Sequence, residues 1–248
     1  MHNKKRKAAN IGKDILDAIH KAFPNGIVEM SIRFDESYLR DIYPKLKMEL
    51  SRIEGAELSY ERDAKGGPRG EESSDPEEDP PDWSEQCSSY HLFFVGLTDQ
   101  RFQYEYESEE PDEDGNMHKV EGIGMIGCTV AVSLLAPYAL IKLRCYERFE
   151  GGGETCPDIE HQIFSLEGGP IEMENHFRET MGEEAVQSIQ ALRATITKVL
   201  ESFGITPLPR EDEEKPVPRL QAGEEVFVGK EHTGKDITVQ EALFFREL

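Results

Sequence analysis

The sequence predicts an α+β protein, in which a largely antiparallel sheet of about five or six strands packs against several helices. Two observations carry this expectation. Runs of strand-forming residues, separated by turn residues, are concentrated between residues 87 and 149. Segments with apolar residues at helical spacing lie on both sides of this region. The strands therefore follow one another instead of alternating with helices, which indicates a meander rather than a parallel sheet.

Residues 1–62 are expected to begin the main domain with a helix, a strand and a second helical segment. Apolar residues recur at helical spacing over residues 11–23, and a Pro-Asn-Gly sequence then stops the helix. Residues 27–34 alternate as a strand does. Asp35 can cap the next helix, in which Pro44 predicts a kink or the start of another helix.

A further candidate strand, residues 57–62, leads into an acidic linker that we expect to be disordered. The linker, residues 63–86, contains nine acidic residues, two basic residues and four prolines. Trp83 is its only large apolar side chain. Such a segment buries too little apolar surface to offset the entropy lost on ordering.

Residues 87–206 are expected to form an antiparallel meander and a long helix of the same domain. The candidate strands are residues 88–97, 101–108, 119–134 and 138–149. The first two are predicted to be antiparallel strands, and the second alternates strictly between aromatic and polar residues. Residues 183–203 carry one apolar stripe at helical spacing, and Gly204 is placed to end this helix.

Residues 207–248 are expected to form a proline-rich crossing segment, a short strand and a final helix. Thr238 and Glu241 have the spacing of a capping box, in which each side chain binds a backbone N–H of the other residue.

The net charge of −22 is the strongest compositional signal. It disfavours direct binding to nucleic acid or to an anionic membrane and favours a basic partner, although acidic surfaces also serve solubility alone. The start of the sequence lacks the apolar stretch of a signal peptide, and no run is apolar enough to span a bilayer. We therefore expect a cytoplasmic protein with free thiols at its four cysteines, Cys87, Cys128, Cys145 and Cys156.

The glycines Gly122, Gly124 and Gly127 match the G-x-G-x-x-G pattern of a dinucleotide-binding turn, and Glu147 follows at a suitable distance. The surroundings fit poorly, because the preceding residues are polar and the following residues favour a strand instead of a helix. Glycines within a strand mark bulges or close packing instead. A dinucleotide- or nucleotide-dependent enzyme centred on these glycines is the alternative to a binding function.

Two other motifs match in part. Gly229, Gly234 and Lys235 fit a phosphate loop, but Asp236 stands where a hydroxyl is needed, so a turn is expected. Residues 110–121 resemble a calcium-binding loop but are flanked by candidate strands, so hairpin chemistry is expected. No spacing indicates a metal site or a serine hydrolase, and we predict no catalytic residue and no cofactor.

These observations favour a non-enzymatic, acidic protein-binding module, of which an immunity or inhibitor protein that captures a basic toxin or nuclease is one class. Large aromatic side chains often anchor such interfaces. The candidate partner-binding residues are Trp83, Glu105, Tyr106, Glu107, Glu109, Glu110, Asp112 and Asp114.

Overall fold

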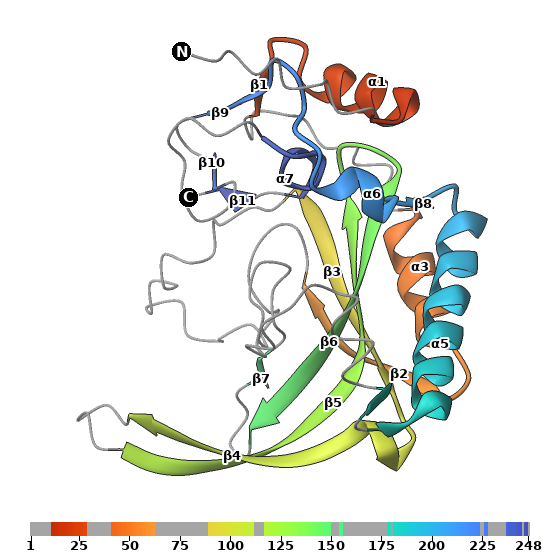
Figure 1. Ribbon diagram of the computed structural model, residues 1–248, viewed down its shortest axis with the longest axis vertical. Helices are drawn as coiled ribbons and strands as arrows, with labels where there is room; N and C mark the ends of the chain where they lie inside the picture. Colours follow the sequence, from red (N-terminus) through yellow and green to blue (C-terminus); the bar gives the residue numbers. More distant parts are fainter. Residues whose placement is uncertain are drawn as a thin grey trace.

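A computed structural model describes residues 11–28, 41–62, 89–111, 117–149, 154–155, 178–179, 181–223, 226–227, 237–244 and 246–247. The predicted acidic linker, residues 63–86, lies outside the described residues. The α+β class is confirmed, because a curled and largely antiparallel sheet packs against helices (Figure 1).

The sheet has seven strands, and five of them are long. The order of hydrogen-bonded neighbours is β2 (Ala56–Arg62), β3 (Tyr90–Leu97), β5 (Met117–Ser133), β6 (Tyr138–Phe149) and β7 (Glu154–Thr155). Two further strands lie off this path: β4 (Gln103–Pro111) pairs with β5, and β8 (Thr206–Pro207) pairs with β6. Among the described pairs of this sheet, β6 and β8 run parallel and the others are antiparallel.

Strand β5 is the centre of the sheet, because its 17 residues pair with three other strands. Its first half pairs with β4 and its second half with β3, both antiparallel, while β6 occupies the other edge. The prediction that residues 88–97 and 101–108 are antiparallel to each other is therefore wrong. A 3-10 turn, η1 (Gln100–Phe102), carries the chain onward along the same edge of β5, so that β3 and β4 follow one another.

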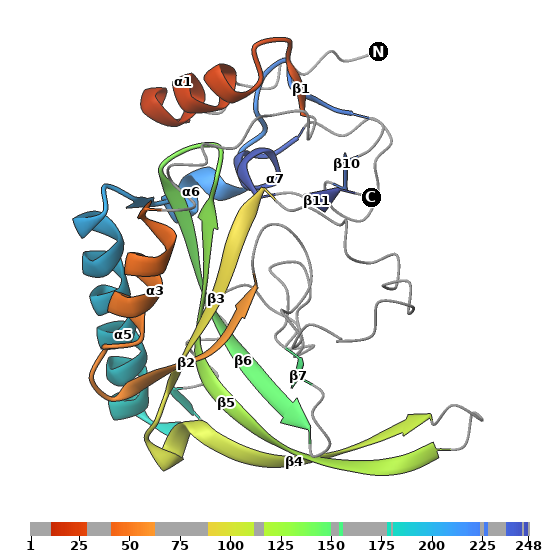
Figure 2. The ribbon, with the colours of Figure 1, turned by 180° about the vertical axis from the view of Figure 1, so that it is seen from behind.

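Two helices cover one face of the sheet, as Figures 1 and 2 show. These are α3 (Tyr43–Leu50) and α5 (Glu183–Ser202). Helix α3 begins at Tyr43 with Pro44 in its first turn, so of the two alternatives predicted for this proline, a kink or the start of a helix, the structure shows the start of a helix. Helix α5 follows the predicted bounds, and Gly204 ends it with a φ of +73°. The apolar stripe of α5 is buried against the sheet through Val186, Ile189, Leu192, Ile196 and Leu200.

The N-terminal and C-terminal segments meet at one end of the sheet (Figure 1). Their elements are α1 (Lys13–Ala22), β1 (Ile27–Val28), α6 (Arg210–Glu213), β9 (Gln221–Ala222), β10 (Val226–Phe227), α7 (Val239–Leu243) and β11 (Arg246–Glu247). Strand β1 pairs with β9, and β10 pairs with β11. A second core joins α1, β1 and α7 to β3, β5 and β6, and its members include Ile19, Phe23, Tyr90, Leu140 and Leu243.

Hydrogen bonds fasten α7 to the sheet. The hydroxyls of Ser89 and Ser133 both donate to the Leu243 carbonyl, at 3.1 and 3.0 Å. The predicted capping box is confirmed at the other end of α7: the Thr238 N–H donates to the Glu241 carboxylate at 2.8 Å, and the Glu241 N–H donates to the Thr238 hydroxyl at 3.2 Å. In the part of the chain that the structure describes, no helix combines the length and the hydrophobicity needed to span a membrane.

Candidate functional site

The three motif glycines all lie inside strand β5. The chain continues as a strand from Gly127 to Ser133, where the dinucleotide motif needs a turn and then a helix. Glu147 lies on the neighbouring strand β6, opposite Gly124. The interpretation of these glycines as strand residues is therefore confirmed.

Close packing explains two of the glycines. A Cβ atom at Gly124 would lie 2.1 Å from Cζ of Tyr104, so the tyrosine ring covers this glycine from the neighbouring strand. A Cβ atom at Gly127 would lie 2.2 Å from the carbonyl oxygen of Val95 and 2.6 Å from Cα of Gly96. Gly127 therefore allows the backbones of β3 and β5 to approach where the sheet curls.

The other two motifs lie partly or wholly outside the described residues. The phosphate-loop candidate at residues 229–236 is outside them. In the calcium-loop candidate, residues 112–116 also lie outside the described residues. Glu110 belongs to β4 and residues 117–121 belong to β5, so two antiparallel strands flank the loop, as the hairpin interpretation predicts. Across the described ranges, no group of three or more His, Cys, Asp or Glu side chains is placed to hold a metal ion.

The predicted partner-binding residues fall on one projecting element. Glu105, Tyr106, Glu107, Glu109 and Glu110 all lie on β4, whereas Trp83, Asp112 and Asp114 lie outside the described residues. Strand β5 begins at Met117, but its pairing with β6 begins only at Gly122. Residues 117–121 of β5 therefore pair only with residues 107–111 of β4 among the described strands. This two-stranded extension of the sheet, which we call the ribbon, projects from the rest of it (Figure 1).

The ribbon region combines acidic residues with exposed apolar side chains. In β5, Met117 is 58% exposed and Ile123 is 59% exposed, and they are two of the four large hydrophobic side chains exposed in the described part of the chain. The register places Glu107 opposite Glu121 and Glu109 opposite Lys119. Like charges directly opposite each other on a sheet destabilise it. The composition of the ribbon is therefore not optimal for its own stability.

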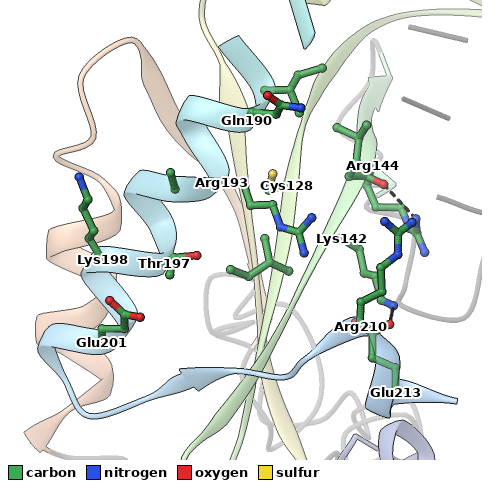
Figure 3. Close-up of a pocket in the computed structure, with 14 residues that line it drawn as sticks. Cys128, Lys142, Arg144, Gln190, Arg193, Thr197, Lys198, Glu201, Arg210 and Glu213 are labelled. Atoms are coloured by element: carbon green, nitrogen blue, oxygen red, sulfur yellow. Dashed lines mark hydrogen bonds and ion pairs between the residues drawn. The ribbon is translucent and has the colours of Figure 1, made fainter. Parts of the chain in front are cut away.

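A second candidate site is a cavity of about 460 Å³ between α5, β6 and α6 (Figure 3). On the edge away from β5, strand β6 pairs with other described strands only near its two ends, at residues 138–139 with β8 and at residues 147–148 with β7. Residues 141–144, which lie between these pairs, line the cavity. Its apolar lining comes from Cys128, Ile141, Leu143, Ile189 and Ala194.

The charged lining of the cavity is mostly cationic. It comprises five cations, Lys142, Arg144, Arg193, Lys198 and Arg210, and two acids, Glu201 and Glu213. Glu213 is engaged already, because it forms an ion pair with Lys142, and these two side chains are only 7% and 15% exposed. Among the described residues, no carboxylate lies within ion-pair distance of Arg193, Lys198 or Arg210.

The guanidinium groups are arranged around the same space. In Figure 3, Arg193 points from α5 toward the side of the cavity where Arg144 and Arg210 are drawn. The Nη1 of Arg144 donates to the Leu143 carbonyl at 2.9 Å. The Nη2 of Arg210 is buried and has no hydrogen-bond partner among the described residues. A buried guanidinium nitrogen without an acceptor is costly, and a ligand oxygen would satisfy it.

Cys128 forms part of the cavity wall as a neutral thiol. Burial raises the pKa of Cys128 from 9.0 to about 12, and the nearby charge of Arg193 lowers it only in part. Since the thiolate is the reactive form of cysteine, Cys128 contributes apolar surface here and no nucleophile near neutral pH.

The sequence interpretation did not identify this cavity, although a signal was present. On α5, the lining residues Gln190, Arg193, Ala194, Thr197, Lys198 and Glu201 recur at intervals of three and four, so they form one stripe of the helix. This second stripe lies next to the apolar stripe that faces the sheet. A mixed stripe in that place indicates that the helix side chains line a cavity at the margin of the sheet.

Comparison of the chain with protein-family models, with curated proteins and with solved structures finds no match.

Proposed function

We propose that this chain is a non-enzymatic binding protein that captures a basic protein partner through the ribbon and the adjoining part of β4. The supporting observation is that the acidic residues predicted to bind a partner, as far as the structure describes them, lie on β4 in or next to the ribbon. The exposed side chain of Met117 belongs to the ribbon, and that of Ile123 lies next to it on β5. An inhibitor or immunity-type protein, acting in the cytoplasm on a toxin or nuclease, is the class we favour.

The physical argument rests on what the ribbon would do without a partner. A two-stranded antiparallel element alone is at best marginally stable in water, and this one carries an acidic majority. Within the ribbon, four glutamates (Glu107, Glu109, Glu110 and Glu121) outnumber the single lysine, Lys119. A basic surface would relieve the repulsion, and Ile123 and Met117 would supply apolar contact beside the charges. Such charges also accelerate encounter with the partner.

The test is affinity capture from the native host at low and high salt, with retained proteins identified and quantified. We expect one basic protein to be retained by the wild type at about one copy per chain and to be released by salt. The variant E105K/E107K/E109K should lose it. The control D17K/E54K/E179K changes the net charge equally at acidic residues on other elements and should keep it.

The arrangement of variants separates capture from solubility. If the control loses the protein as fully as the β4 variant does, overall charge is responsible and the ribbon is not the site. If no protein is retained in stoichiometric amount by the wild type at either salt concentration, the proposal fails. A further substitution, Ile123→Ser, should weaken capture without altering its salt dependence, because it removes apolar contact only.

A further inference from the structure

We propose that the cavity between α5, β6 and α6 binds a small organic phosphate, with the phosphate held by Arg193 and Arg210 and the organic part resting on the apolar wall. This site is separate from the ribbon, and the inference does not depend on protein capture.

The charge of the lining is the first step of the argument. Five cations and two acids line the cavity, in a chain whose net charge is −22. Cationic side chains that converge repel one another unless an anion lies between them. With Glu213 engaged by Lys142, the described lining leaves Glu201 as its other acid, and Figure 3 draws Glu201 and Lys198 away from Arg193 and Arg210. The arginine side of the cavity is therefore suited to an anion.

The buried nitrogen of Arg210 is the second step. Its Nη2 lacks a hydrogen-bond acceptor among the described residues, although it is shielded from water. The ion pair between Lys142 and Glu213 joins β6 to α6, the helix that begins at Arg210. This mostly buried ion pair fixes α6 against β6, and it therefore keeps Arg210, three residues before Glu213, at the cavity. A ligand oxygen at this point would complete the hydrogen bonding of the guanidinium.

The number of donors selects phosphate over carboxylate. A single arginine can satisfy a carboxylate with two parallel N–H donors. Here the donors come from separate elements, Arg193 from α5 and Arg210 from α6, with Lys142 and Arg144 of β6 beside them. A phosphate monoester presents three terminal oxygens and close to two negative charges at neutral pH, so it can accept from several arginines at once.

The remaining surface of the cavity suits an apolar group. Ile141, Leu143 and Ile189 line it, together with the thiol of Cys128. Its volume of about 460 Å³ is within the range of roughly 300–1,000 Å³ that is usual for small-molecule pockets. Inorganic phosphate alone would leave this apolar surface unused, so an ester is expected to bind more tightly.

The test is calorimetric titration of the full chain at low salt with three probes: phenyl phosphate, inorganic phosphate and benzoate. We expect phenyl phosphate to bind at least about tenfold more tightly than either of the other two probes. Inorganic phosphate lacks the apolar ring, and benzoate has a carboxylate in place of the phosphate. The affinity should fall as salt is raised.

Two arginine variants locate the binding. Arg193→Gln should weaken phenyl phosphate about tenfold or more, and Arg193 is exposed, so the fold should persist. Arg52→Gln makes the same change in charge at an exposed arginine of the turn after α3, and it should leave the affinity unchanged. The ribbon variant E105K/E107K/E109K should also bind the ester normally, which keeps this test independent of protein capture.

Three results would overturn the proposal: no heat of binding with phenyl phosphate, equal affinity of Arg193→Gln and wild type, or benzoate bound as tightly as the ester. Equal affinities for inorganic phosphate and phenyl phosphate would refute the assignment of the apolar wall.

Discussion

Replacing Gly127 by alanine tests whether the glycines of β5 serve the packing of the sheet. The added methyl carbon would lie 2.2 Å from the Val95 carbonyl oxygen and 2.6 Å from Cα of Gly96. Both atoms belong to the backbone of β3, which is paired with β2 on one side and β5 on the other. Relief would require the two strands to separate by roughly 1 Å. The structure therefore predicts a large loss of stability.

The expected loss can be set against the gain from alanine. Overpacking of a core costs about 1–3 kcal/mol, and a backbone obstacle places this site near the upper end. Alanine is favoured over glycine within a strand by roughly 0.5–1 kcal/mol. The net loss for Gly127→Ala is then about 2–2.5 kcal/mol, which corresponds to a fall in Tm of roughly 4–10 °C for a chain of this size.

Gly124→Ala is the matched control. Its methyl carbon would meet the ring of Tyr104, with Cζ at 2.1 Å, and not the backbone. Since Tyr104 is only half-buried, its ring can move aside, and we expect a loss of about 1 kcal/mol or less. Urea unfolding followed by circular dichroism measures both variants. If Gly127→Ala is as stable as the wild type, or if Gly124→Ala costs more, the packing argument is refuted.

Two further predictions concern the cavity. Lys142→Met should lower the free energy of unfolding by about 3 kcal/mol, because it leaves the Glu213 carboxylate buried without its partner. Because burial raises the pKa of Cys128 to about 12, the folded chain holds a proton that the unfolded chain begins to lose near pH 9.0. Stability should therefore be complete below that pH and fall by about 1.4 kcal/mol per pH unit above it.

Each of these predictions has a control. The double variant K142M/E213L, which removes both charges, should recover more than half of the loss seen with Lys142→Met. A double variant as unstable as the single one would contradict this. Cys128→Ala should fall in stability less steeply than the wild type in urea titrations at pH 8.5 and pH 10. Parallel pH profiles would show that the thiol does not contribute.

The elements that were predicted well are those with local signals. Helix α5 follows from a 3.6-residue stripe ended by Gly204, and α7 follows from the capping box of Thr238 and Glu241. The length of β5 was anticipated because strand-forming residues outweighed the glycine motif. The partners of β4 were not, because the choice between β3 and β5 depends on the turn at residues 100–102 and on contacts between residues distant in the chain.

The sequence by itself determined the helices α5 and α7, the long strands β3, β4, β5 and β6, and the acidic character, because periodicity and charge are properties of neighbouring residues. Tertiary structure alone decided that Gly127 meets the backbone of β3, and that Lys142, Arg193 and Arg210 line one cavity. These residues come from β6, α5 and α6. They meet because the buried apolar stripe of α5 packs against the sheet and because the Lys142–Glu213 ion pair joins α6 to β6. These contacts join residues far apart in the chain, so no periodic pattern in the sequence predicts them.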